Sequence, residues 1–241
     1  MIHWEVFERF GPRMLEGFAV TLELALGSTL LGLLLAAPAA LARAFGSAPL
    51  SAAVLAYTYL FRGTPLLAQL FLIYHGSAQF QAELSRVGAW WLFRDPFFCS
   101  LLTFTLNTSA YQAEIFAGAL RNVPHGEIEA ARAAAMPPIL AARRIILPIA
   151  ARLALRPFGN ELILMVKASA LASVVTVYDL LATAKLAFQR TYDFQAYIAA
   201  ALVYILTVET IRRIWNGLDN RLNRHLQPSE YPRKGHASGA P

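Results

Sequence analysis

The sequence of 241 residues has a single cysteine, Cys99, and lacks the short patterns that bind nucleotides or metals. One cysteine excludes a disulfide framework, and we expect Cys99 to be a small buried side chain because it lies in an apolar run. No G-x-x-x-x-G-K-[ST] segment occurs, so we expect neither ATP nor magnesium to bind to this chain. No His, Cys and carboxylate group has metal-ligand spacing, and no nucleophile has a base nearby. The sequence therefore predicts a protein without cofactor or catalytic site.

Charged residues are also scarce, at 15% of the sequence, against 57% hydrophobic residues. The charges fall in clumps between long apolar runs, which is typical of a multi-span membrane protein. The net charge of +6 is compatible with nucleic-acid binding. However, the basic residues concentrate in a stretch in the middle of the chain and in the C-terminal tail, where orientation in a bilayer explains them. We predict an all-α protein in a lipid bilayer, with no nucleic-acid partner.

The apolar runs predict about five transmembrane helices, because about 20 apolar residues cross a hydrocarbon core of about 30 Å. The predicted spans are residues 17–42, 52–74, 97–120, 158–182 and 194–215. Residues 1–16, before the first span, mix acidic and basic residues and lack the pattern of a cleavable signal peptide. We therefore expect this segment on the outer membrane surface. We predict one transmembrane domain, residues 17–226. Residues 227–241, rich in Pro, Gly and Ser, are predicted to be a disordered cytoplasmic tail.

The distribution of arginines predicts the orientation of these spans. Four of them, Arg143, Arg144, Arg152 and Arg156, lie between the third and fourth spans, and more follow the fifth. The loops 75–96 and 178–194 carry balanced charge instead. Since cytoplasmic loops are enriched in Lys and Arg, we predict a periplasmic N-terminus, a cytoplasmic C-terminus and a multi-pass protein of the bacterial inner membrane.

The second span is interrupted by Arg62-Gly63-Thr64-Pro65. Pro65 breaks a helix and Gly63 loosens it, which a bilayer tolerates only where protein or a cavity satisfies the freed backbone groups. Arg62 then has two possible roles. It either faces a translocation pathway or anchors helices by hydrogen-bonding the exposed carbonyls at the kink.

The third span carries a polar stripe of Asn107, Tyr111 and Glu114 at helical spacing. Such a stripe faces either the interior of the bundle or water, because a charge at the bilayer centre is costly. In one interpretation the stripe lines a translocation path. In the other, its side chains form hydrogen bonds that hold neighbouring helices together. Glu161 and Lys167 of the fourth span are further candidates for the path. Six residues separate them, so we expect them on different faces of their helix.

Residues 122–148 are the longest middle stretch that is too polar for lipid. Pro124 suits the first turn of a helix, and Glu127 and Glu129 then lie where the helix dipole stabilises carboxylates. Arg132 is placed to pair with Glu129. The rest is nearly all alanine up to Met136-Pro137-Pro138, which we expect to end the helix. This charged rod suits either insertion into a groove of another protein or a position on the lipid headgroups.

Three motifs resemble those of the membrane subunits of ABC importers for polar amino acids. They are the F-R-G-T-P string at 61–65, the E-A-A loop at 129–131 with I-I-L-P at 145–148, and N-E-x-x-x-L-x-K in the fourth span. The third span and the loop together are similar to the histidine and arginine branch and to opine importers.

The resemblance implies a second homologous membrane subunit, identical or different, two ATPase subunits that hold ATP and magnesium, and a periplasmic binding protein for amino acids. The residues that it implies for ATPase docking, with their neighbours in the predicted helix, are Glu127, Glu129, Ala130, Ala131, Arg132 and Ala135. Ala135 replaces the usual glycine of the family.

The main alternative is a proton-coupled carrier or channel in which Glu114, Glu161 and Lys167 form a relay. The basic amino acids histidine, arginine, lysine and ornithine, or opines, are the solutes that the resemblance implies.

Overall fold

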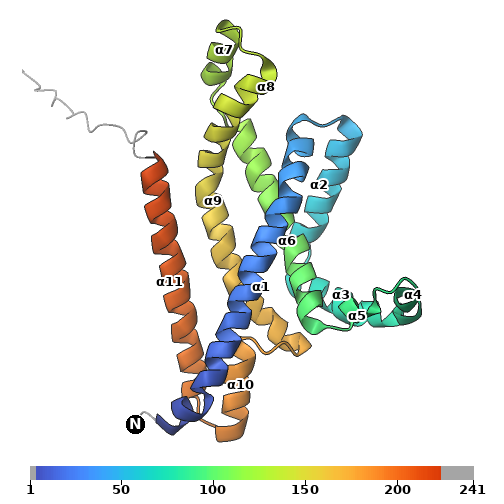
Figure 1. Ribbon diagram of the computed structural model, residues 1–241, viewed down its shortest axis with the longest axis vertical. Coiled ribbons are helices and arrows are strands. Elements are labelled where there is room, and N and C mark those ends of the chain that lie inside the picture. Colours follow the sequence, from blue (N-terminus) through green and yellow to red (C-terminus); the bar gives the residue numbers. More distant parts are fainter. Residues whose placement is uncertain (1–3, 224–241) are drawn as a thin grey trace, which may run out of the picture.

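The computed structural model describes residues 4–223, and every regular element among them is a helix (Figure 1). The prediction of an all-α chain is confirmed. The long helices are α1 (Trp4–Phe45), α6 (Pro96–Arg121), α9 (Leu147–Ala168) and α11 (Gln195–Asn223). The shorter ones are α2 (Ala48–Gly63), α3 (Leu66–Gln79), α4 (Gln81–Arg86), α5 (Trp90–Phe93), α7 (His125–Ala133), α8 (Pro138–Ala141) and α10 (Leu180–Thr191). The predicted tail, residues 227–241, lies outside the described residues.

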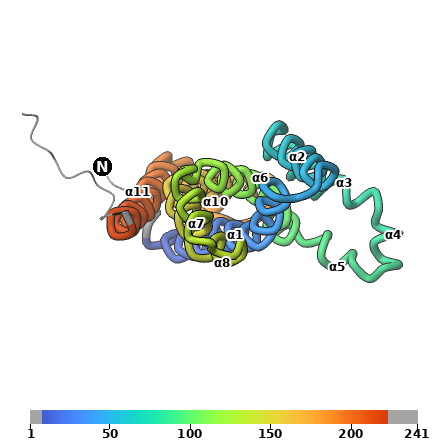
Figure 2. The backbone as a smooth tube through the Cα atoms, turned by 90° about the horizontal axis from the view of Figure 1, so that it is seen from above, coloured from blue at the N-terminus to red at the C-terminus, as the bar shows by residue number. Residues whose placement is uncertain are grey.

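The long helices run between two ends of the molecule. In Figure 1, the start of α1 and α10 lie at one end, and α7 and α8 form the other end. Viewed from above in Figure 2, α2 to α5 lie on one side of this bundle and α11 lies on the other. Within residues 4–223, two helical segments are long and apolar enough to span a membrane, Glu8–Phe45 and Pro138–Val175.

The centre of the bundle is the contact between α1 and α6. Gly32 of α1 allows a close approach there, because a Cβ atom at this position would lie 2.7 Å from Cγ2 of Thr108. Leu24 of α1, Phe104 of α6 and Val166 of α9 are fully buried in the largest apolar cluster. α6 begins at a proline, and the Asp95 carboxylate caps it by accepting a 3.0 Å hydrogen bond from the Phe97 amide. Of the polar stripe of α6, Asn107 is buried, while Tyr111 and Glu114 are partly exposed.

Two predicted boundaries differ from the structure. The segment before residue 17 is not separate from the first span, since α1 is continuous from Trp4 and buries Phe10 and Met14 near α10 and α11. The fourth span was predicted at 158–182, whereas helical structure extends through a π-helical turn, Ala142–Ile146, and α9 to a 3-10 turn, Ser169–Val175. The arginines before the predicted span are part of this helical segment, in which Arg143, Arg144 and Arg156 are exposed and Arg152 is partly buried.

Candidate translocation and coupling site

The predicted break in the second apolar run is present, between the end of α2 at Gly63 and the start of α3 at Leu66. Its freed backbone carbonyls are satisfied by two amide side chains. Gln69 donates from Nε2 to the carbonyl oxygens of Phe61 at 2.8 Å and Thr64 at 3.1 Å. Asn107 of α6 donates to the Phe61 oxygen at 2.9 Å and to Oε1 of Gln69 at 3.0 Å. Asn107 therefore joins α6 to the break.

Arg62 does not make the hydrogen bonds to carbonyls that one interpretation of the sequence assigned to it. Its side chain is exposed, and its guanidinium lies over the ring of Tyr111, 5.1 Å from the centroid. The Tyr111 hydroxyl donates weakly, at 3.4 Å, to the Arg62 carbonyl oxygen. The second residue of the polar stripe therefore also contacts the break.

The third residue of the stripe, Glu114, is the hub of an ionic cluster. Its Oε1 lies 3.5 Å from Nε of Arg43 and accepts a 3.0 Å hydrogen bond from Thr58, and its Oε2 lies 3.7 Å from Nη2 of Arg121. These partners come from the end of α1, from α2 and from the end of α6. Glu114 thus ties three helices together at the end of the bundle that carries α7.

Glu161 and Lys167 have different environments. The Glu161 side chain is buried, and its Oε1 accepts a 2.9 Å hydrogen bond from Thr108 of α6. Gln112 extends this polar chain by donating to Thr108 and to the Thr29 carbonyl of α1. Lys167 is exposed and forms no ion pair with Glu161. The prediction that they occupy different faces of the helix is confirmed.

α7 packs through one apolar residue against the ends of α6 and α9. Ile128 of α7 packs with Val123, Ile146 and Ala150 in one apolar cluster. The one large apolar residue of this helix is therefore partly buried within the chain.

The surface of α7 carries three charged side chains. Glu127, Glu129, Ala130 and Arg132 are exposed, and Glu129 and Arg132 form no ion pair of the expected kind. Ala131 differs from the expectation, because its side chain is only 3% exposed and faces the chain itself. A partner would thus contact the glutamates, Ala130 and Arg132, while Ala131 supports the helix from inside.

α7 does not end at the prolines. Ala135 has φ of +50°, in the left-handed region, and two hydrogen bonds close the end of the helix. The Ala135 amide donates to the Arg132 carbonyl at 2.9 Å, and the Met136 amide donates to the Ala131 carbonyl at 3.1 Å. This is a Schellman motif, in which glycine is usual because it has no Cβ atom. Pro138 instead begins the next helix, α8.

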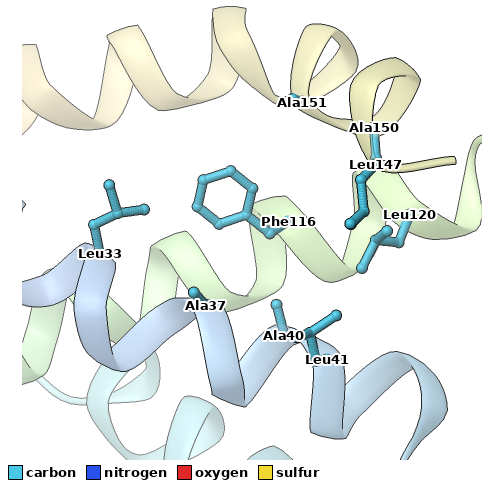
Figure 3. Close-up of a pocket in the computed structure, with 9 residues that line it drawn as sticks. All are labelled: Leu33, Ala37, Ala40, Leu41, Phe116, Leu120, Leu147, Ala150 and Ala151. Carbon is cyan, nitrogen blue, oxygen red and sulfur yellow. The ribbon is translucent and has the colours of Figure 1, made fainter. Parts of the chain in front are cut away.

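An apolar cavity of about 270 Å³ lies between α1, α6 and α9 (Figure 3). Phe116 of α6 points into it, and its other lining side chains are alanines and leucines. It offers no hydrogen-bonding side chain, so a charged or polar solute has no site there.

Three polar residues with structural roles were missed by the sequence interpretation. Gln69 follows Pro65 by one helical turn, and this spacing is the signal that was available for it. Trp215 of α11 donates from Nε1 to the Leu155 carbonyl at 2.7 Å, and Asp219 pairs with Arg156 at 2.7 Å. Both contacts join α9 to α11, and no local spacing predicts them because the partners are distant in the sequence.

Residues 17–224 match the family described as "Binding-protein-dependent transport system inner membrane component". The chain belongs to this family.

Individual relatives agree with this membership. The chain is 41% identical over 223 residues to the nopaline transport system permease protein NocM of Agrobacterium fabrum, covering 92% of each chain. It is 40% identical over 214 residues to the histidine/lysine/arginine/ornithine transport system permease protein HisM of Escherichia coli, covering 88% of this chain and 90% of that one. A chain in the crystal structure of an amino acid ABC transporter with histidines is 31% identical, with a TM-score of 0.80, and the match covers 92% and 99% of the two chains.

Proposed function

We propose that this chain is the permease subunit of an ATP-driven ABC importer for polar amino acids, with histidine, arginine, lysine, ornithine or opines as the solutes. The family and the relatives named above support this class. The observation that carries the proposal is α7, a short helix with exposed charges that is attached through Ile128 to the ends of α6 and α9. Such a helix is suited to transmit movement from a partner to the bundle.

In this proposal the chain crosses the bacterial inner membrane five times. The crossings are α1, α2 with α3, α6, α9 and α11, with the N-terminus in the periplasm and α7 in the cytoplasm. α2 and α3 have 16 and 14 residues, or about 24 and 21 Å at about 1.5 Å per residue. Neither alone crosses a core of about 30 Å, so we assign the two to one crossing.

The proposed partners are a second homologous membrane subunit, two ATPase subunits with ATP and magnesium, and a periplasmic binding protein. Closure of the ATPases on nucleotide would pull α7, and α6 and α9 would tilt with it. A translocation cavity between the two membrane subunits, distinct from the apolar cavity within this chain, would then open to each side of the membrane in turn. A proton relay through Glu114, Glu161 and Lys167 has little support, because Glu114 is paired with arginines and Lys167 is exposed.

The test uses the tagged complex, purified from its native cells and reconstituted in proteoliposomes. We expect uptake of labelled arginine or histidine to require ATP, and a P-loop ATPase to copurify with the chain. Glu129→Lys, which reverses a charge on the exposed edge of α7, should remove most of the copurifying ATPase. Glu83→Lys, an equally exposed change on α4, is the matched control and should retain it. Uptake by the lone chain without ATP would refute the proposal.

A further inference from the structure

The guanidinium group of Arg62 has no carboxylate partner within the chain. None of the ion pairs among residues 4–223 includes it, and its one defined contact is with the Tyr111 ring. That contact fixes the position of the group, because the ring face attracts the cation. The side chain remains exposed, so its hydrogen-bond donors are available to another molecule.

Neighbouring polar side chains are already engaged. Asn107 and Gln69 use their amide donors on the carbonyls of the break and on each other. The Glu161 carboxylate is buried and accepts a hydrogen bond from Thr108. Arg62 and Tyr111 are therefore the groups at the break that are open to an incoming ligand.

The position of Arg62 in the chain favours a partner for its charge. It lies at the end of α2, next to the break between two helices that we assign to one membrane crossing. An unpaired cation at that depth is costly, and charged residues in spans face a cavity or pair with one another. The planar guanidinium matches a carboxylate particularly well, through two parallel hydrogen bonds.

We propose that Arg62, oriented by Tyr111, binds the carboxylate of the transported solute during its passage. This inference rests on the proposed function, since it assigns part of the solute site to this chain. The carboxylate is common to all α-amino acids and to opines, so the site recognises the shared group and leaves selection of the side chain to other parts of the importer. A carboxylate side chain of the second membrane subunit would bind Arg62 in the same way. The experiment below distinguishes this carboxylate from that of the solute.

The experiment measures equilibrium binding of radiolabelled L-arginine and L-argininamide to the purified complex of this chain with its membrane and ATPase partners. The amide lacks the carboxylate and keeps the rest of the solute. We compare the unaltered complex with Arg62→Gln and Arg62→Lys. Arg94→Gln is the matched control, because Arg94 is also exposed but lies in the loop before α6.

We expect the unaltered complex to bind L-arginine at least about tenfold more tightly than the amide, as loss of a charged hydrogen-bond pair requires. Arg62→Gln should abolish this preference, Arg62→Lys should retain part of it, and Arg94→Gln should retain all of it. A preference that survives in Arg62→Gln overturns the inference. Loss of the second membrane subunit from the Arg62→Gln complex also overturns it, because the carboxylate is then the partner's. Absence of ATP-driven uptake in the unaltered complex instead refutes the proposed function.

Discussion

Ala135→Gly should stabilise the loop that follows α7. Ala135 has φ of +50°, where an L-residue with a Cβ atom costs about 1 to 2 kcal/mol. Glycine removes this cost, but it also increases the conformational entropy of the unfolded loop. That increase lowers the stability of the folded loop by about 0.4 to 1 kcal/mol. The Ala135 side chain is exposed, so no packing is lost. The difference predicts a gain of about 0.5 to 1 kcal/mol in local stability.

Hydrogen exchange in nanodiscs measures this local stability. The amide protons of Ala135 and Met136 close the Schellman motif, and we expect their exchange to slow about two- to fivefold in Ala135→Gly. Ala130→Gly is the control, because Ala130 lies within α7 and is also exposed. Glycine there should weaken the helix by up to about 1 kcal/mol and speed exchange. Equal effects of the two substitutions would refute the assignment of strain to Ala135.

Two further predictions concern contacts between helices and are checked by thermal unfolding in detergent. In Gly159→Ala, the new Cβ atom would meet the Trp215 ring at 2.3 Å, so we expect about 1 to 3 kcal/mol of destabilisation. Gly118→Ala, with open space around it, should be neutral or stabilising. Glu114→Gln removes a carboxylate that is 20% exposed and faces two arginines, and should cost about 1 to 3 kcal/mol. Glu127→Gln breaks no ion pair and loses only a helix-dipole interaction, so it should cost less than about 1 kcal/mol. A loss equal to that of Glu114→Gln would contradict the assignment of Glu114 as a hub.

Features encoded by local spacing were predicted well from the sequence. The break before Pro65 and the short helix after Pro124 are both present, because proline restricts the backbone wherever it occurs. The separation of Glu161 from Lys167 followed from helical geometry alone. Ala135 was singled out because it replaces a glycine, and the left-handed backbone at this position is the physical reason for that glycine.

Features that depend on contacts between distant segments were not predictable. The helical spacing of Glu114 predicted the face of the helix on which it lies. It did not predict that the side chains of Arg43 and Arg121 lie beside its carboxylate. The buried position of Ala131 depends on how α7 packs onto α6 and α9, which the alanine-rich sequence does not encode locally. In each case tertiary packing decided the outcome.

Site-specific cross-linking tests the central claim, the coupling of α7 to an ATPase, most directly. Cys99 is buried, so a cysteine introduced at an exposed position is the reactive one. We would compare Glu129→Cys with Glu83→Cys in native membranes, using a bifunctional thiol reagent and mass spectrometry of the products. The account predicts a covalent adduct with a P-loop ATPase from Glu129→Cys and none from Glu83→Cys. An ATPase adduct from Glu83→Cys alone would contradict it.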